Sequence, residues 1–497
     1  MPPITAAESP HPSPTGSHTV EKIGGTSMSD YRAVRDNIVL AGGGPESALG
    51  RIFVVSAYGG VTDRLLEHKK SGDAGVYALF RESEDEGGDG CWRDALAALQ
   101  QHFYAINDSL FDDALTRRLA NKTIGDKVDT VRDCLANLET LCRHGHFSLE
   151  TQLSAVRELL ASLGEAHSAW NLVRCLQRDG IPAKLVDLTG WSDPKDLTLD
   201  ERIYRAFQDL EISACVPIVT GYARSEQGLL SQFDRGYSEM TFSRIAVITG
   251  ACEAIIHKEY HLSSADPRIV GVEQVVPIGR TNYDVADQLS ALGMEAIHPQ
   301  AARGLRERGI PLRIKNTFEP DHAGTLITAD YVSPAPCVEI VAGRRGVHAI
   351  EHFDQDMVGQ MGARDQRLLG LLERHGARVI SKDVNANTIT HYVACSLKRL
   401  KRIIRDMEQS FPSATVTTQR VALVSAIGSD LALRGLLADT AAALSGAGVS
   451  ISAVHQSRRQ IDMRFVIDEA DYTTAVTALH RRLVESQDHG SAIAKAS

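Results

Sequence analysis

His18-Thr19-Val20-Glu21-Lys22-Ile23-Gly24-Gly25-Thr26-Ser27 is the stretch that says most about the fold of this chain. Its first half has the β-branched character of a short strand, and its second half is a turn of two glycines and two hydroxyls. Glycines let the backbone approach an anion, hydroxyls donate hydrogen bonds to phosphate oxygens, and Lys22 supplies a positive charge. The stretch therefore predicts a strand that ends in a phosphate-binding loop. An ordinary strand–turn–helix junction capped by Ser27 or Ser29 is the alternative.

The loop differs from the P-loop, in which the lysine follows the glycines. At 497 residues the chain should form two or three domains. A formal net charge of -10 argues against a nucleic-acid-binding surface, and no apolar run reaches the roughly 18 residues of a membrane span. The eight cysteines are scattered without a Cys-x-x-Cys pair, which predicts reduced thiols in a cytoplasmic protein and neither a zinc site nor a disulfide framework.

Strand and helix patterns alternate along the first two thirds of the chain. Residues 1–17 are rich in proline and serine, lack the order of a signal peptide and are expected to be disordered. From residue 18 to about 333 the alternation predicts one α/β domain, an αβα sandwich with a mostly parallel sheet and a helical excursion at about 64–178. The strand patterns lie at residues 51–57, 183–187, 216–221, 254–257 and 312–315.

The composition changes at Ser333-Pro334-Ala335-Pro336, where a domain boundary is expected. Two similar βαββα patterns follow, at residues 337–412 and 418–486, and residues 487–497 are expected to be a flexible tail. Duplicated ferredoxin-like units of this kind bind small molecules or dimerise, although a purely structural role is the alternative.

Four more clusters of glycines, hydroxyls and charges follow the Lys22 loop. Each has an ordinary structural interpretation as a turn or a helix cap. Arginine is nevertheless the side chain best suited to grip a carboxylate with two hydrogen bonds. The clusters occupy Ser56–Thr62, Gly164–Glu165, Phe233–Glu239 and Ser263–Arg268.

In their order and approximate spacing these clusters resemble the aspartokinases. Lys22-Ile23-Gly24-Gly25-Thr26-Ser27 is similar to the family's Lys-Phe-Gly-Gly-Thr-Ser, and the stretch 55–62 is similar to its Val-Ser-Ala-x-x-Gly-Val-Thr. The resemblance covers about 19–485 and implies an amino-acid-kinase-like α/β fold followed by tandem ACT domains. The stretches around Glu165, Arg235, His257 and Arg280 look like the divergent aspartokinases associated with the biosynthesis of ectoine, a compatible solute.

The resemblance also implies roles for single residues, with ATP and Mg²⁺ as cofactors and no metal ligated by the protein itself. Lys22 would stabilise the transferred phosphoryl group, and Arg235 would fix the substrate. The implied phosphate and nucleotide contacts are Gly24, Gly25, Thr26, Ser27, Lys258, Ser263, Asp266 and Arg268. The implied aspartate pocket consists of Ser56, Thr62, Glu165, Arg235, Ser238 and Glu239.

Physical chemistry suggests how such a site would work. The acceptor, the β-carboxylate of aspartate, has a pKa of about 3.9 in solution and is already ionised at neutral pH, so no general base is needed. The obstacle is the approach of two anions. Catalysis should therefore rest on positive charge and positioning by Lys22, backbone N–H groups, Mg²⁺ and Arg235, while Glu165 suits the α-ammonium group of the substrate.

The chain departs from the family pattern on the nucleotide side. Where most aspartokinases have an acid, this chain has Lys258, and where they have a lysine it has Glu295. This exchange predicts that the two residues face each other near the nucleotide. Glu239 replaces an aspartate and is one methylene longer, which favours a role in orienting the lysine. His257 and His261 lie four residues apart, but no third ligand is evident, so no metal site is predicted.

The sequence thus predicts an aspartate kinase that makes 4-phospho-L-aspartate from ATP and L-aspartate, as a step towards ectoine through aspartate semialdehyde. One alternative is another phosphotransferase of the same fold, acting on glutamate or a nucleotide. The other is a catalytically silent, ACT-bearing amino-acid sensor. The expected partners are the two substrates, an amino-acid effector at the ACT pair and further copies of the chain in a homodimer or larger homo-oligomer, but neither nucleic acid nor membrane. Asp354–Val358 replaces the usual glycine-rich start of the first ACT unit, so the effector contacts are not carried over.

Overall fold

The chain forms two compact units in a computed structural model. The first comprises residues up to His261 together with Ile297–Ala329, and the second comprises Leu262–Ala296 and residues from Asp330 onward. The structure describes residues 16–68, 72–82, 91–144, 146–191, 193, 195–294 and 296–494. Residues 1–15 of the predicted N-terminal extension lie outside the described residues.

The first unit is built on a mostly parallel sheet. Its strands follow one another in the order β3-β4-β2-β1-β5-β7-β8, and only the last pair, β7 with β8, is antiparallel among these pairs. The strands are β1 (Thr19–Ile23), β2 (Arg51–Val55), β3 (Ala183–Val186), β4 (Val216–Thr220), β5 (Glu253–Lys258), β7 (Leu312–Asn316) and β8 (Thr325–Thr328). The predicted mostly parallel sheet is confirmed.

Strand β1 is buried on both faces of the sheet. Val20 and Lys22 point to one face, Glu21 and Ile23 point to the other, and all four are buried. Strands of parallel sheets are covered by helices on both sides, which explains the continuous burial of β1, β2 and β4.

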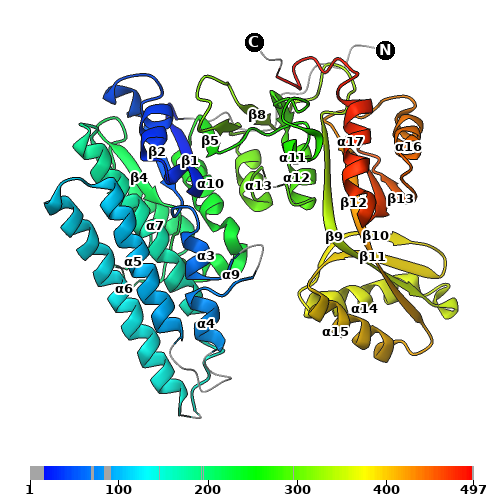
Figure 1. Ribbon diagram of the computed structural model, residues 1–497, viewed down its shortest axis with the longest axis horizontal. Helices are drawn as coiled ribbons and strands as arrows, with labels where there is room; N and C mark the ends of the chain where they lie inside the picture. The colour runs from blue at the N-terminus through cyan, green and yellow to red at the C-terminus, as the bar shows by residue number, and fades with distance from the viewer. Residues whose placement is uncertain are drawn as a thin grey trace. The chain divides into compact units, whose positions relative to one another are not determined.

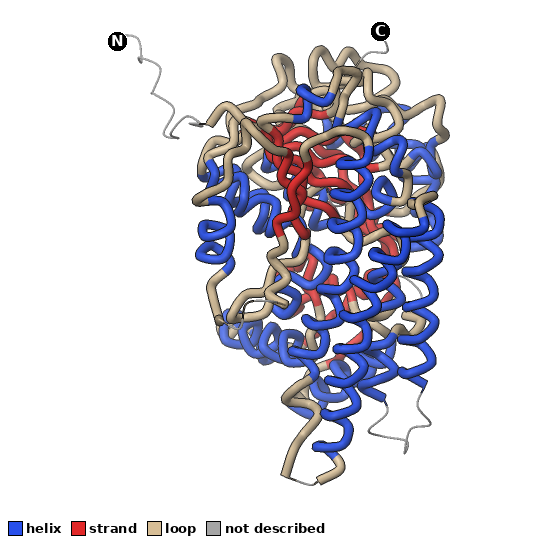
Figure 2. The backbone as a smooth tube through the Cα atoms, turned by 90° about the vertical axis from the view of Figure 1, so that its left-hand side faces the viewer, coloured by secondary structure: helices blue, strands red, loops and turns tan. Residues whose placement is uncertain are grey.

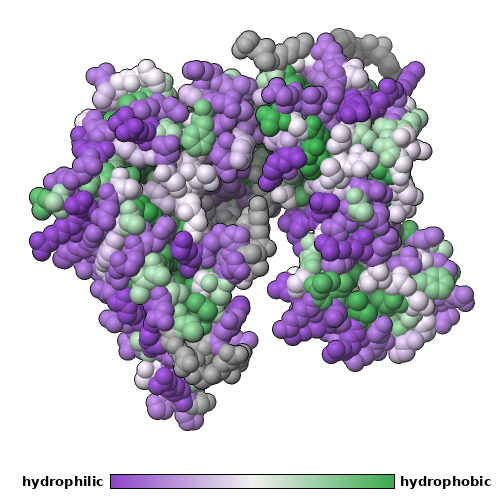
Figure 3. Space-filling view, viewed as in Figure 1, coloured by the Kyte–Doolittle hydropathy of each residue, from purple (hydrophilic) through white to green (hydrophobic). Residues whose placement is uncertain are grey.

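Long helices form the excursion between β2 and β3, as the sequence predicts. Helix α7 packs on β2, β3 and β4, and α5 and α6 pack beside it (Figures 1 and 2). Asp113 caps α6 by accepting a hydrogen bond from the amide of Thr116. The surface of these helices that Figure 3 shows is mostly hydrophilic. The helices are α3 (Val61–Leu65), α4 (Val76–Glu82), α5 (Cys91–Leu110), α6 (Ala114–Cys142) and α7 (Leu153–Arg178).

The remaining helices of this unit flank the ends of the strands. Helix α10 packs on β1, β2 and β5 and also against α8 and α13. The other helical segments are α1 (Gly25–Met28), α2 (Tyr31–Ala33), the π-helix η1 (Val34–Val39), η2 (Pro45–Ala48), α8 (Leu199–Phe207), α9 (Leu229–Phe233), the 3₁₀ turn η3 (Asp234–Gly236), α10 (Tyr237–Thr249) and α13 (Pro299–Glu307).

The second unit carries an antiparallel sheet in the order β10-β11-β9-β12-β14-β13. Two βαββα units supply it, as predicted, and Figure 1 shows their helices in yellow to red. The first consists of β9 (Ile340–Phe353), η4 (Gln355–Met357), α14 (Met361–Arg374), β10 (Arg378–Val384), β11 (Thr388–Ala394) and α15 (Leu397–Ser410). The second consists of β12 (Thr415–Ile427), α16 (Leu436–Gly446), β13 (Ile451–Gln456), β14 (Asp462–Asp468), η5 (Glu469–Asp471) and α17 (Tyr472–Leu483).

Residues 262–296 belong to the second unit, whereas the sequence suggested one catalytic domain over 18–333. They form α11 (Pro267–Val270), β6 (Arg280–Asn282) and α12 (Tyr283–Ala291). Ile278, Val285 and Leu289 join the hydrophobic core beneath β9 and β12, which is why the segment groups with that sheet. A buried hydrogen bond of 2.9 Å between Ser264 Oγ and His480 Nε2 adds a polar contact with α17.

The last described residues are also part of this unit. Ile493 forms a β-bridge with Ile278, and the carbonyl of Ala492 accepts a hydrogen bond from the amide of Gly279. Both apolar side chains are buried, in a segment that the sequence predicts to be part of a flexible tail. Among the described residues, no helix combines the length and apolar character needed to cross a bilayer.

Candidate active site

The carboxyl ends of the parallel strands bring the predicted site residues together. Ile23 at the end of β1 is in register with Val55 of β2 and with His257 of β5. Thr220 of β4 is in register with Val55 in turn. The Lys22 loop and the segments that follow these strands therefore meet at one edge of the sheet, where open α/β sheets bind their ligands.

Lys22 and Glu239 form an ion pair at this edge. Lys22 Nζ lies 3.6 Å from Glu239 Oε1, and only 8% of Lys22 is exposed. Glu239 Oε2 accepts a hydrogen bond of 2.5 Å from the amide of His298, which fixes the carboxylate. The pair agrees with the predicted role of Glu239 in orienting the lysine.

Two lysines act on Glu239. Burial raises the pKa of this carboxyl, but Lys22, Lys258 and the amide of His298 outweigh the burial, so the pKa lies below its ordinary value. The carboxylate is therefore ionised at neutral pH. Lys258, at the end of β5, thus faces the site electrostatically, whereas Glu295, its predicted counterpart, lies outside the described residues.

Glu165 lies on α7 and is 2% exposed. The hydroxyl of Tyr237 donates a hydrogen bond of 2.6 Å to Glu165 Oε1, while Oε2 is buried without a hydrogen-bond partner among the described residues. Burial raises the pKa of Glu165 to about 7, against the opposing effects of the Tyr237 hydroxyl, the Ala57 backbone and Lys22. A buried carboxylate oxygen without a donor is costly, and a cationic group of a ligand would satisfy it.

Glycines allow the close approaches that build this site. A Cβ atom on Gly164 would lie 2.7 Å from the Cβ of Ala57, and one on Gly221 would lie 2.6 Å from the carbonyl oxygen of Val55 and 2.9 Å from the Cβ of Ser238. Helix α7 can therefore place Glu165 beside the strand ends only because these positions lack side chains.

The predicted phosphate loop is a tight turn into α1. The amide of Gly24 donates a hydrogen bond to the carbonyl of His257, and a Cβ on Gly25 would lie 2.7 Å from the carbonyl oxygen of Ala57. The hydroxyl of Ser27 is buried and hydrogen-bonded to that of Thr317 at 2.8 Å. Thr26 is exposed. Thr26 thus presents a hydroxyl to solvent, whereas Ser27 already has a partner inside the protein.

The other predicted substrate residues lie on the same elements. Ser56 follows β2, Thr62 lies in α3 and interacts with the Tyr237 phenol, and Ser238 is buried in the first turn of α10. Arg235 lies in the turn η3 directly before α10. Its implied grip on the substrate remains a prediction.

Three predicted nucleotide residues belong to the second unit. Asp266 caps α11 by accepting the amide of Arg268, and its carboxylate also accepts two hydrogen bonds of 3.1 Å from the guanidinium of Arg268. Ser263 forms a β-bridge with Pro277. Their contacts with a nucleotide remain predictions.

His257 belongs to a buried ionic network on the other face of β1. Its Nε2 lies 2.7 Å from Glu21 Oε2, and the guanidinium of Arg51 donates to both oxygens of Glu21 at 2.6 and 2.8 Å. His261 instead contacts Glu319 at 3.0 Å. In the part of the chain that the structure describes, no group of three or more histidines, cysteines or acids could hold a metal.

Sequence reasoning assigned no role to Tyr237 or His298. A tyrosine within Arg235-Gly236-Tyr237-Ser238 was visible in the sequence, but its contact with Glu165 spans 72 positions along the chain. His298 acts on Glu239 chiefly through its backbone amide, and this contact spans 59 positions along the chain.

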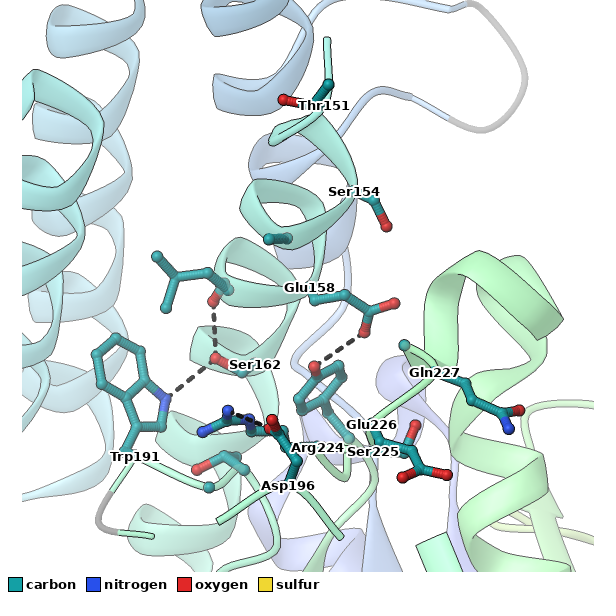
Figure 4. Close-up of a pocket in the computed structure, with 16 residues that line it drawn as sticks. Thr151, Ser154, Glu158, Ser162, Trp191, Asp196, Arg224, Ser225, Glu226 and Gln227 are labelled. Atoms are coloured by element: carbon teal, nitrogen blue, oxygen red, sulfur yellow. Dashed lines mark hydrogen bonds and ion pairs between the residues drawn. The ribbon is translucent and has the colours of Figure 1, made fainter. Parts of the chain in front are cut away.

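A separate cavity of about 570 Å³ lies between α7 and the segments that follow β3 and β4. Its lining includes none of the predicted site residues. Figure 4 shows Glu158 reaching into it from α7, and the indole N–H of Trp191 donating to Ser162 at 3.0 Å. The carboxylate of Glu158 accepts hydrogen bonds from Tyr222 and from the amides of Leu230 and Ser231, so both of its oxygens are used.

Comparison with known proteins separates a kinase region from an ACT region. A model of the amino acid kinase family matches residues 18–316, and an ACT domain model matches residues 424–483. Aspartate kinase Ask_Ect of Stutzerimonas stutzeri is 52% identical over 479 residues, which are 96% of this chain and 100% of that protein. Aspartokinase of Saccharomyces cerevisiae is 26% identical over 96% of this chain and 95% of that protein. The crystal structure of E. coli aspartokinase III with aspartate and ADP superposes with a TM-score of 0.70, at 19% identity, over 94% of this chain and 100% of that one.

Proposed function

This chain belongs to the aspartokinases of the amino acid kinase family, and we propose that the site around Lys22 and Glu165 is where it acts. It is an aspartate kinase, an enzyme that phosphorylates the β-carboxylate of L-aspartate to give 4-phospho-L-aspartate. The observation that carries the assignment of the site is the buried Glu165 Oε2, which lacks a donor, at the sheet edge that also holds Lys22.

We propose that Glu165 binds the α-ammonium group of aspartate. A cation there would complete the hydrogen bonding of Oε2 and offset the burial of the carboxylate. Arg235, Ser238, Ser56 and Thr62 would hold the two carboxylates of the substrate. Arginine can bind a carboxylate through two parallel hydrogen bonds, which fixes its orientation.

Lys22 is proposed to stabilise the transferred phosphoryl group. The β-carboxylate is ionised at neutral pH, so the main barrier is repulsion between it and the nucleotide phosphates. Lys22, held by Glu239, would lower that repulsion from a fixed position. The turn of Gly24 and Gly25, which leaves no room for side chains, would let the backbone approach the phosphates.

ATP is the proposed phosphoryl donor, with Mg²⁺ as the accompanying ion. Mg²⁺ usually keeps several waters and binds substrate phosphates through one or two protein carboxylates, so it can accompany ATP without a dedicated cage of protein ligands. When bound, the ion would neutralise charge on the phosphates. Ser263, Asp266, Arg268 and Lys258 are proposed to contact the nucleotide.

A coupled ADP-release assay tests this function. Aspartate should stimulate ADP release, and glutamate at the same concentration should not. A preference for glutamate or a nucleotide would point to another phosphotransferase of the same fold. Nucleotide binding without any acceptor-dependent ADP release would point to a catalytically silent sensor.

The name of the Stutzerimonas relative and the four resembling stretches support a place in ectoine synthesis. We propose that 4-phospho-L-aspartate from this enzyme is reduced to aspartate semialdehyde on that route. Deleting the gene in its host should abolish the accumulation of ectoine under salt stress while lysine and threonine prototrophy persists. Loss of prototrophy with unchanged ectoine would contradict the proposal.

The duplicated ACT unit supports regulation by an amino acid and assembly into a homodimer or larger homo-oligomer. The cytoplasm is the proposed location. Light scattering would measure the assembly. Activity with millimolar lysine, threonine or ectoine would identify the effector, and an unchanged rate with all three would favour a structural role for the unit.

A further inference from the structure

Tyr237 connects both sides of the proposed aspartate pocket. It is the first residue of α10, is 3% exposed, and donates its hydroxyl to Glu165 on α7. Its phenol also interacts with Thr62 of α3, and its ring meets that of Tyr222 edge to face, with centroids 5.9 Å apart. Helices α3, α7 and α10 of the proposed pocket thus meet at one side chain.

We propose that Tyr237 is a positioning residue for aspartate, because its hydroxyl occupies one oxygen of Glu165 and leaves the other for the α-ammonium group of the substrate. The inference rests on the proposed function and deepens it. With Oε1 tied to Tyr237, the carboxylate cannot rotate freely, and Oε2 is presented in one orientation. A substrate cation then meets a preorganised acceptor and no side-chain freedom is lost on binding.

The surrounding charges keep Tyr237 a donor. Burial raises its pKa well above the ordinary value, and the carboxylate of Glu165 acts in the same direction, so the phenol keeps its proton at any working pH. Glu165 itself faces Lys22 from β1, Tyr237 from α10 and Tyr222 from the segment after β4. Of these side chains, Tyr237 donates a hydrogen bond to the carboxylate, at Oε1, and the backbone of Ala57 also acts on the carboxylate.

Helix α7, which carries Glu165, also carries Glu158, and Glu158 forms a comparable pair with Tyr222. The hydroxyl of Tyr222 donates to Glu158 Oε2 at 2.9 Å, and Glu158 Oε1 accepts two backbone amides. Both oxygens of Glu158 are therefore used, as Figure 4 shows in part, whereas Glu165 retains one without a donor. A buried tyrosine–glutamate hydrogen bond that serves only stability should resemble the Tyr222–Glu158 pair, in which both carboxylate oxygens have donors.

The experiment compares Tyr237→Phe with Tyr222→Phe, since both substitutions keep the ring and remove one buried hydroxyl. Tyr237→Phe should raise KM for aspartate roughly tenfold or more, with kcat and KM for ATP changed about twofold at most. The pH below which KM for aspartate rises should move up by about one unit, because the charged form of Glu165 loses a donor. Tyr222→Phe should change none of these values.

A double-mutant cycle completes the test. In a Glu165→Ala background, Tyr237→Phe should add no further rise in KM for aspartate. An unchanged KM, an equal effect of Tyr222→Phe, a loss confined to kcat, or a melting temperature far below that of Tyr222→Phe would overturn the proposal. Wild-type turnover of aspartate is measured first. Its absence would overturn the proposed function and this inference with it, whereas normal wild-type turnover with an unaffected Tyr237→Phe would overturn the inference alone.

Discussion

Lys22 is a strand residue and also the proposed catalytic cation. Its backbone completes β1, its side chain emerges at the edge of the sheet, and Glu239 holds it at 3.6 Å. The surrounding protein leaves it little exposed, so its charge is less screened by water than that of a surface lysine. A fixed, poorly screened cation is what the approach of two anions requires.

Replacing Lys22 by alanine should lower kcat by about 10²–10³-fold, by analogy with the loss of one preorganised donor. The measurement is ADP release at saturating substrates. Lys184→Ala is the control and should leave kcat unchanged, because Lys184 is the exposed residue of β3. Near-normal turnover of the Lys22 variant would show that another group carries the charge.

Glu165 predicts a pH dependence of substrate binding. Its pKa is raised to about 7, so the carboxylate gains a proton as the pH falls through 7 and loses the charge that attracts the ammonium group. KM for aspartate should therefore rise by about tenfold for each pH unit below 7. KM for ATP, measured over the same range, should not follow. A flat profile for aspartate down to pH 5.5 would contradict the assignment.

At the scale of elements, three neighbouring strands are joined by a buried ionic network. The carboxylate of Glu21 in β1 accepts a hydrogen bond from Arg51 in β2 and is hydrogen-bonded to His257 in β5. Arg51 also donates to the carbonyls of Ile38 and Val39 at the end of η1. Burial opposes ionisation of Glu21, but His257 and Arg51 outweigh it and lower its pKa to about 2. The network therefore fixes the strand whose end carries the Lys22 loop.

Glu21→Ala should lower the free energy of unfolding by about 3–5 kcal/mol at pH 7, because it leaves buried charge unpaired. Since the pKa of Glu21 is lower in the folded state, its contribution is complete above the unfolded value of about 4.3 and is lost as the pH falls towards 2. Urea unfolding should thus show the wild type and the variant converging between pH 5 and pH 2.

Glu253→Ala is the control for this prediction. Glu253 pairs with Arg313 on the neighbouring strands β5 and β7, but both side chains are partly exposed. The control should cost less than about 1 kcal/mol. Equal losses for the two variants would show that burial of the network does not matter.

The local sequence predicted individual helices and strands better than it predicted which of them pack into the same unit. Helix α15 lies within the first predicted βαββα pattern, since its apolar positions recur at helical spacing and Ser396 supplies the cap. The strand patterns at 216–221 and 312–315 likewise correspond to β4 and β7. For residues 262–296, nothing in the local sequence indicated which core would bury their apolar side chains.

At the scale of the whole molecule, the chain crosses between its units more than once. Residues 262–296 leave the first unit, contribute Ile278, Val285 and Leu289 to the core of the second, and are followed by α13 of the first. Asp266 and Arg268, which are proposed to contact the nucleotide, therefore lie in a segment whose apolar side chains are buried in the core of the second unit.

A chain that ends at Ala329 should consequently not fold as a stable kinase domain. It would keep residues 262–296 without the sheet that covers their apolar side chains, and exposed patches of this kind promote aggregation. Size-exclusion chromatography and dye binding should reveal aggregates. Ile278→Ser with Leu289→Ser in the shortened chain should reduce them. A monomer with cooperative unfolding would instead support the predicted domain boundary near residue 333.

The sequence by itself determined the family, the α/β class, the duplicated ACT units and the identity of the motif residues, because these depend on local periodicity and on the order of short motifs. Only the tertiary structure decided which motif residues meet. The Lys22–Glu239 pair, the Tyr237–Glu165 bond and the oxygen of Glu165 that lacks a donor join positions far apart in the chain. Such contacts depend on strand register and on helix packing, and neither follows from the residues of one segment.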